Sequence, residues 1–384
     1  MANIAKIDDV ALASVAKLMG RAKAAGDDVM GVIYPSVGSI VQSVQQVEIT
    51  VTATATSNTA IISSVDTTQS IILPNWQRQS STIDDPDHLS FGLTLTNATT
   101  VTATRSVAAQ EATISATVLE FVSGTLTSNQ SGTIVISSPD TTNTDTISSI
   151  TTSRSLVVWN GDNTTEDISS DFRQTPCTLS LTNSTTVTAE RPDGTDQSAT
   201  SYYSVIEFAS GVTDQVQEVE ITVSGSATSN TATITSVDTS RSVVFPGGFR
   251  GGTDGGTVGS PYRMYAELTN ATTVTGTRDV IAVGGNDAGI TATVVEFATG
   301  KLTSVQRGVA TIATTDVTKD VTISSIATST SAVCWLGYSD GDSSRVEPED
   351  QYATVKILDS TTLRFERATT SAFDLSVSYE VWEF

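Results

Sequence analysis

The sequence predicts an all-β protein: four tandem antiparallel six-stranded β-sandwich domains, in an A-B-A-B order, after a short N-terminal anchor. Three observations carry this prediction. Whole phrases recur at a constant spacing, apolar and hydroxyl residues alternate with a period of two, and no helical periodicity is present beyond residue 40. Thr, Val and Ile dominate the alternating runs, and their branched side chains suit a pleated strand.

Three phrases recur four times in the same order. The first is LTNATTVTATR, and its asparagine falls at Asn97, Asn183 and Asn270 and is replaced by Asp359 in the fourth copy, in steps of 86, 87 and 89 residues. The others are ISSVDTTQS and a four-residue ending, VLEF, VIEF, VVEF or VWEF. Such a period indicates four tandem modules, each large enough for a core of its own. The predicted domains are an anchor over 1–36 and repeats over 37–124, 125–211, 212–300 and 301–384.

Each repeat contains six strand-like runs. In the first repeat they lie near 47–55, 59–65, 69–73, 90–96, 99–105 and 113–121. Asn97 falls between the fourth and fifth runs and predicts a hairpin turn, because asparagine tolerates left-handed backbone conformations. Six short antiparallel strands, each with one apolar face, are expected to close as a two-sheet sandwich.

An arginine and a glutamate recur with the repeats. Arg105, Arg191, Arg278 and Arg367 end the fifth run, and Glu120, Glu207, Glu296 and Glu383 precede the last phenylalanine. We interpret them as partly exposed cross-strand ion pairs that belong to the fold. A ligand site at each pair is the alternative.

The repeats also alternate in pairs. Repeats one and three share VEITV and ATSNTA, whereas repeats two and four carry Trp159 and Trp335 after the third run. A pair of domains is therefore a candidate packing unit.

Composition restricts the class of protein. The chain has 384 residues, a net charge of −22 and six lysines without a basic stripe, so a nucleic-acid partner is not expected. The sequence contains neither an apolar run of membrane-spanning length nor the apolar core of a signal peptide. We expect synthesis in a cytoplasm, and Cys177 and Cys334 as unpaired, buried small side chains.

Catalytic groups are sparse in the sequence. His88 is the only histidine and lies in a polar turn, which argues against a Ser-His-Asp triad or a histidine-rich metal site. Carboxylate pairs could serve a glycosidase, and the DGD at 340–342 could hold calcium, but solvated acidic loops account for both. The carboxylates concerned are Asp84, Asp85, Asp87, Asp340, Asp342, Glu347, Glu349 and Asp350. A non-enzyme without a cofactor or metal is predicted.

The first 36 residues differ from the repeats. They carry four basic and four acidic residues, so the repeats hold the whole net charge of −22. Their apolar pattern fits either a helix or a hairpin and is too short for a core. We interpret this leader as an anchor that docks on a larger partner, through Ile4, Ile7, Val10, Val15 and Leu18.

The leader resembles a known family of sequences. IAKIDDVALASVAKLMG is similar to the IAK-x-N-G leader of many structural proteins of tailed bacteriophages, with Asp8 and Asp9 where Asn-Gly is usual. The repeats resemble the Thr/Ser-rich β-modules of phage virion proteins, and their VxEF strands resemble six-stranded H-type lectin-like sandwiches. The resemblance implies a virion surface component on the head, neck or tail, such as a fibre, spike or decoration protein. It also implies other virion proteins as partners, synthesis in the host cytoplasm, and homo-oligomers, often trimers.

A glycan-binding adhesin or receptor-binding protein is the alternative function. Aromatic rings stack on sugars, and the candidate contacts to a host-surface glycan are Trp76, Trp159, Trp335 and Tyr338. The tryptophans also follow strands, where they would cap a core. The structural role is the favoured one.

Overall fold

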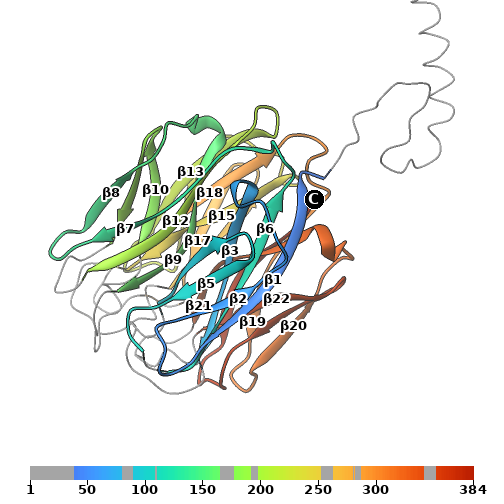
Figure 1. Ribbon diagram of the computed structural model, residues 1–384. Helices are drawn as coiled ribbons and strands as arrows, with labels where there is room; N and C mark the ends of the chain where they lie inside the picture. The colour runs from blue at the N-terminus through green and yellow to red at the C-terminus, as the bar shows by residue number, and fades with distance from the viewer. Residues whose placement is uncertain are drawn as a thin grey trace, which may run out of the picture. The chain divides into compact units, whose positions relative to one another are not determined.

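The structure, a computed structural model, describes residues 39–79, 90–108, 110–164, 177–191, 198–251, 263–279, 281, 287–340 and 352–384. The chain divides into two compact units, Met1–Ser39 and Ile40–Phe384, and the fold described below is that of the second. The described residues of this unit form strands and three short 3₁₀ turns (Figure 1), so the predicted all-β class is confirmed.

Each repeat contributes six strands. Those of the first repeat are β1 (Val41–Val51), β2 (Ser57–Ile61), β3 (Ser70–Gln79), β4 (Gly92–Asn97), β5 (Thr100–Thr104) and β6 (Ala112–Phe121). Those of the second are β7 (Leu126–Ile136), β8 (Thr142–Thr146), β9 (Ser155–Thr164), β10 (Thr178–Asn183), β11 (Thr186–Glu190) and β12 (Ala199–Phe208). Those of the third are β13 (Thr213–Val223), β14 (Ser229–Thr233), β15 (Ser242–Arg250), β16 (Tyr265–Asn270), β17 (Thr273–Thr277) and β18 (Ala288–Phe297). Those of the fourth are β19 (Ser304–Ile312), β20 (Thr318–Thr322), β21 (Ser331–Asp340), β22 (Thr354–Asp359), β23 (Thr362–Glu366) and β24 (Leu375–Glu383). The 3₁₀ turns are η1 (Thr67–Gln69), η3 (Thr152–Arg154) and η5 (Thr328–Thr330).

The sheets cross from one repeat to the next. Within the first repeat the strands form two trios, β1-β6-β3 and β2-β5-β4, and the second trio continues into the next repeat as β2-β5-β4-β9-β12-β7. Two more six-stranded sheets are shared in the same way, and a three-stranded sheet remains at each end of the chain. These five sheets are arranged as in a β-propeller, so the prediction of four separate sandwich domains is wrong. The prediction failed because near-identical repeats carry the same edge strand. The alternating pattern does not determine which copy pairs with that edge.

A glycine allows each shared sheet to form. β4 meets β9 at the pair Gly92↔Gly161, and Gly161 has a φ of 99°. A Cβ on Gly161 would lie 2.0 Å from the carbonyl oxygen of Phe91, so only glycine permits this approach. Gly248 and Gly337 occupy the same position at the next two joints.

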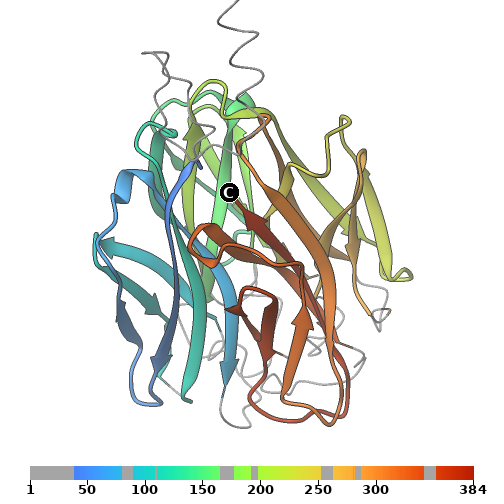
Figure 2. The same cartoon turned by 90° about the vertical axis from the view of Figure 1, so that its right-hand side faces the viewer.

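The last repeat closes on the first. The side chain of Gln46 in β1 bonds both the N–H and the C=O of Ile357 in β22, at 2.7 and 3.0 Å. Arg78 in β3 pairs with Glu366, and β1 and β3 lie beside the strands of the fourth repeat in both views (Figure 2). No strand ladder is described at this joint, where Trp76, with a φ of 64°, stands in the place of the joint glycine. The two terminal trios thus occupy the position of one further six-stranded sheet.

The joint between the second and third repeats is built from equivalent contacts. The carboxylate of Glu218 accepts a hydrogen bond from the N–H of Leu181, as Gln46 does from Ile357. Arg250 pairs with Glu190 and Glu220, as Arg78 pairs with Glu366 and Glu48. Ring closure therefore uses the same interactions as an internal joint.

Four phenylalanines meet where the repeats converge. Phe121, Phe208, Phe297 and Phe384 are the last residues of the four VxEF phrases, and they are buried. Neighbouring rings pack edge to face around a closed circuit, with centroids 5.8, 5.6, 5.7 and 6.4 Å apart. This geometry is favourable for aromatic pairs and couples all four repeats.

The last strand of each repeat is buried on both faces. In β6, Val118 belongs to a core drawn from the first repeat alone, whereas Leu119 and Phe121 join a core that extends through all four repeats. This explains why the VxEF phrases are nearly continuous in apolar residues and do not alternate like an exposed strand.

The A-B alternation includes one cross-strand pair. Val47 faces Ala116 in the first repeat, whereas Gly132 faces Tyr203 in the second. A Cβ on Gly132 would lie 2.5 Å from the Tyr203 hydroxyl, so the large ring requires the glycine. The same pairs recur as Val219↔Ala292 and Gly308↔Tyr379.

The predicted arginine–glutamate ion pairs are wrong. Arg105 is 1% exposed and donates to the carbonyl oxygens of Thr52, Ala55 and Gln110, at 2.6–3.1 Å. Glu120 instead accepts from the Ser43 hydroxyl and the Asp66 N–H, each at 2.7 Å. Arg191, Arg278 and Arg367 also bind loop carbonyls. Each guanidinium group donates its N–H groups to several loop carbonyls at once. A carboxylate partner would have taken some of these donors.

The hairpin turn at Asn97 is confirmed, but its predicted left-handed backbone is wrong. The Asn97 Oδ1 atom accepts from the N–H and the hydroxyl of Thr99, at 2.9 and 3.1 Å. Asn183, Asn270 and Asp359 do the same, and Trp76 is the non-glycine residue with positive φ in the described chain. The side chain closes the turn through its oxygen, so aspartate can replace asparagine in the fourth repeat.

We predict that Phe208→Ala lowers the free energy of unfolding by about 3–5 kcal/mol, because it leaves a cavity inside the aromatic circuit. The measurement is urea unfolding followed by circular dichroism. Ile61→Ala is the control, since Ile61 is 77% exposed and its loss should change stability by less than about 0.5 kcal/mol. Equal effects of the two substitutions would show that the circuit does not couple the repeats.

We predict that Asn183→Val destabilises the protein by about 1 kcal/mol, the usual contribution of a lost hydrogen bond, whereas Asn183→Asp is close to neutral. Aspartate keeps the oxygen acceptor and is the natural residue at Asp359. Thermal melting of both variants checks this. A loss of stability in the aspartate variant as large as in the valine variant would contradict the role of the acceptor.

Candidate functional site

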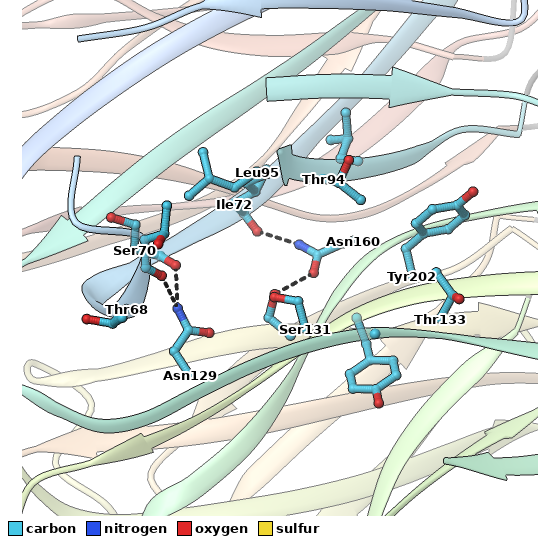
Figure 3. Close-up of a pocket in the computed structure, with 15 residues that line it drawn as sticks. Thr68, Ser70, Ile72, Thr94, Leu95, Asn129, Ser131, Thr133, Asn160 and Tyr202 are labelled. Atoms are coloured by element: carbon cyan, nitrogen blue, oxygen red, sulfur yellow. Dashed lines mark hydrogen bonds between the residues drawn. The ribbon is translucent and has the colours of Figure 1, made fainter. Parts of the chain in front are cut away.

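A groove lies at the joint between the first and second repeats. Its volume is about 460 Å³, and it is lined by η1, β3 and β4 of the first repeat and by β7, β9 and β12 of the second (Figure 3). The described residues that line it are Ser, Thr, Asn, Tyr, Ile, Leu and Gly, without an ionisable carboxylate, amine, guanidinium or imidazole. The groove is therefore neutral in a chain of net charge −22.

Two asparagine amides bridge the repeats at this groove. Asn129 donates to the carbonyl oxygens of Thr67 and Ser70, at 3.0 and 2.7 Å. Asn160 donates to the carbonyl oxygen of Ile72 at 2.9 Å and accepts from the Ser204 hydroxyl at 3.0 Å. The Oδ1 atom of Asn129 is buried and has no hydrogen-bond partner among the described residues. The amides hold the two walls together, and one buried acceptor is left without a partner among the described residues.

Tyr202 lies at one end of the groove. Its hydroxyl accepts a hydrogen bond from Asn163 at 3.0 Å, and its side chain is half-buried. The ring lies against Gly92, where an added Cβ would be 2.2 Å from the ring carbons. Gly92 therefore creates the space for this aromatic wall.

The matching joint between the third and fourth repeats is filled. Arg307 stands where Ser131 stands in the groove, and Glu380 stands where Ser204 stands. The Arg307 Nε donates to the Glu380 carboxylate at 2.6 Å, and its Nη1 donates to the carbonyl oxygen of Thr239 at 2.9 Å. The remaining cavity is about 220 Å³. Gln46 and Glu218 fill the other two joints, so Ser131 is the one short side chain at this position.

The aromatic residues predicted to contact glycans are buried. Trp76, Trp159, Trp335 and Tyr338 are 7, 0, 1 and 2% exposed. Trp76 stacks on Trp159 and on Trp335, with centroids 4.9 and 5.0 Å apart. The rings pack on one another in the core and present no open face to a sugar, so their assignment as glycan contacts is contradicted. They lie within β3, β9 and β21, and core packing, the alternative interpretation of the tryptophans, is what the structure bears out.

Asp162 is a buried carboxylate that sequence reasoning missed. It is 3% exposed and accepts from the Ser201 hydroxyl at 2.5 Å and from the Cys177 N–H and the Trp159 indole N–H, both at 3.1 Å. Burial raises the pKa of Asp162 to about 7, and the three hydrogen bonds offset part of that shift. The other repeats have Gln77, Phe249 and Tyr338 at this position, so only the breakdown of the repeat pattern could have signalled it.

Several predicted residues lie outside the described part of the chain. These are the anchor residues Ile4, Ile7, Val10, Val15 and Leu18, together with Asp84, Asp85, Asp87, His88, Asp342, Glu347, Glu349 and Asp350. Asp340 is described and binds the Arg263 guanidinium at 2.6 Å in a buried ion pair, which occupies it structurally. Cys177 and Cys334 are buried thiols that do not form a disulfide.

The described ranges lack both a metal-binding cluster and a membrane-spanning helix. They contain no group of three His, Cys, Asp or Glu side chains that could hold a metal ion. They also contain no helix long and apolar enough to cross a membrane.

No protein-family model matches this chain, and no curated protein matches its sequence.

We predict that Asp162→Asn stabilises the protein above pH 7. Because the pKa of Asp162 is raised on folding from 3.8 to about 7, its stabilising contribution is fully present below about pH 4 and is lost as pH rises through 7. The asparagine amide can accept from Trp159 and Cys177 and donate to Ser201, so it should remove up to about 4 kcal/mol of penalty at pH 8 and change little at pH 4.

Urea unfolding at pH 4, 6 and 8 measures this difference. Asp140→Asn is the matched control, because it removes an exposed carboxylate in place of a buried one. A parallel pH dependence of the wild type and the Asp162→Asn variant would contradict a neutral, buried Asp162.

Proposed function

We propose that this protein is a non-enzymatic structural component of a phage particle surface, such as a fibre, spike or decoration protein of the head, neck or tail. In this proposal the N-terminal leader anchors it to other virion proteins after synthesis in the host cytoplasm. The observation that supports it best is that the β-ring, Ile40–Phe384, has two ends of different character.

The ring begins at the end that holds the phenylalanine circuit. The carbonyl oxygen of Ile40 accepts a hydrogen bond from the N–H of Val122 at 2.8 Å, and Val41 pairs with Phe121. The repeat sequence is most regular at this end, where all four VxEF phrases finish. A constant end at which the ring begins suits attachment.

The strands that flank the most variable segments end on the other side. β3 starts beside Glu120 and ends at Gln79, which pairs with Ala112, so it runs away from the phenylalanine circuit. β9, β15 and β21 run in the same direction against β12, β18 and β24. The segments after them, 80–89, 165–176, 252–262 and 341–351, differ in sequence between repeats. One end for anchoring and one for variable segments is the arrangement expected of a displayed surface protein.

Charge supports the same division. The leader is neutral, and the ring carries the net charge of −22, so burial against a partner costs less desolvation at the leader. A homo-oligomer, such as a trimer, would dock several leaders at once and strengthen a weak individual contact.

A glycan-binding adhesin or receptor-binding protein is the second candidate. The observation that favours it is the neutral, hydroxyl-lined groove at the first joint, and not the buried tryptophans.

We predict that deletion of residues 2–36 leaves a folded ring in solution and abolishes its incorporation into particles. Serine at Ile4, Ile7, Val15 and Leu18 should have the same effect, because the apolar side chains would make the contact. The measurement is a protein gel of purified particles from cells that express each variant.

The matched control replaces Asp27 and Asp28 by Asn, which alters the leader outside its apolar pattern. This variant should be incorporated normally. A normal band for the truncated protein would show that the ring carries its own attachment surface, and the anchor would be rejected.

A further inference from the structure

We propose that the groove between the first and second repeats, lined by Asn129, Asn160, Ser131, Ser204 and Tyr202, binds a neutral carbohydrate. This inference deepens the second candidate function and does not rest on the virion role, because sugar binding is measured on the purified protein.

The chemistry of the groove selects a neutral, hydroxylated ligand. Hydroxyl and amide side chains both donate and accept hydrogen bonds, as sugar hydroxyls do. The described residues of the lining offer no charge to pair with an ionic ligand, and an unpaired charge is costly to remove from water. The net charge of −22 further disfavours an anion.

The groove combines polar and aromatic walls in a way that fits a pyranose ring. The Asn129 Oδ1, buried and without a partner among the described residues, lies on the side of the amide away from its bonds to Thr67 and Ser70 (Figure 3). Tyr202 lies across the groove and can stack on the C–H face of a sugar. The volume of about 460 Å³ falls within the range of about 300–1,000 Å³ typical of small-molecule sites.

The filled joint between the third and fourth repeats shows that the hollow is not needed for packing. The same backbone there accommodates Arg307 and Glu380 where the groove has Ser131 and Ser204. Ser378 stands at the position of Tyr202. The protein thus provides residues that close the groove or remove its aromatic wall and that this fold tolerates.

The test uses the purified full-length protein and saturation-transfer NMR. The probes are glucose, galactose, mannose, N-acetylglucosamine, lactose, cellobiose and chitobiose, with sialyllactose as the anionic comparison. At least one neutral sugar should receive saturation from the wild type, and sialyllactose should not bind more strongly than lactose. The Kd of the bound sugar is then measured by titration.

Two groove variants locate the binding. The double variant Ser131→Arg, Ser204→Glu should weaken the Kd at least tenfold by filling the groove, and Tyr202→Ser should weaken it at least fivefold by removing the aromatic wall. Thr269→Ala, at the filled joint, is the control and should leave the Kd unchanged. Thermal melting confirms that each variant is folded, and Tyr202→Ser keeps the test decisive if the double variant does not fold.

The outcomes are distinct. Absence of binding by every neutral sugar, binding of sialyllactose alone, or an unchanged Kd in Tyr202→Ser would overturn the proposal. Incorporation of Tyr202→Ser into particles is expected to be normal, so failure of the sugar site leaves the anchor proposal standing, and the reverse also holds.

Discussion

The pairing of one repeat's edge strand with the next repeat is the interaction on which the rest of the structure depends. β4, β10 and β16 each pair with the following repeat opposite a glycine of positive φ. An unpaired edge strand exposes backbone hydrogen-bond donors and acceptors. A tandem array satisfies them most simply when each edge strand pairs with a strand of the next repeat. The first and the last repeat therefore each keep a three-stranded sheet that no described strand ladder joins to another repeat. The two meet through Gln46 and Arg78, and a linear array becomes a ring.

Many of the repeated polar residues stabilise this ring and have no chemical function of their own. Gln45, for example, bonds both the N–H and the C=O of Ser63, at 2.7 and 3.1 Å, and Gln130, Gln217 and Gln306 make the same pair of bonds. Together with the buried arginines and the turn asparagines, they satisfy backbone groups in loops too short for regular ladders. Repetition of a polar residue in this chain therefore indicates a structural role.

Functional candidates arise where the repetition fails. Ser131 replaces the long side chains of the other joints and leaves a neutral groove, whereas Asp162 places a carboxylate where the other repeats have uncharged side chains. In a ring with four equivalent joints, one joint can lack the long side chain that fills the others, because the other three joints still stabilise the fold. This division explains how a chain with few reactive groups could still carry a binding site.

The sequence by itself determined the β class, the number of repeats, the strands near their observed positions and the hairpin turns, because these depend on local alternation and on side chains within a few residues. It did not determine which strands pair between repeats, because four near-identical copies offer equivalent partners. Arg105, Trp76 and Ser131 show what the sequence could not determine, because their neighbours come from distant loops or from other repeats. Only the tertiary structure decided that Arg105 binds carbonyl groups, that Trp76 lies in the core and that Ser131 opens a groove.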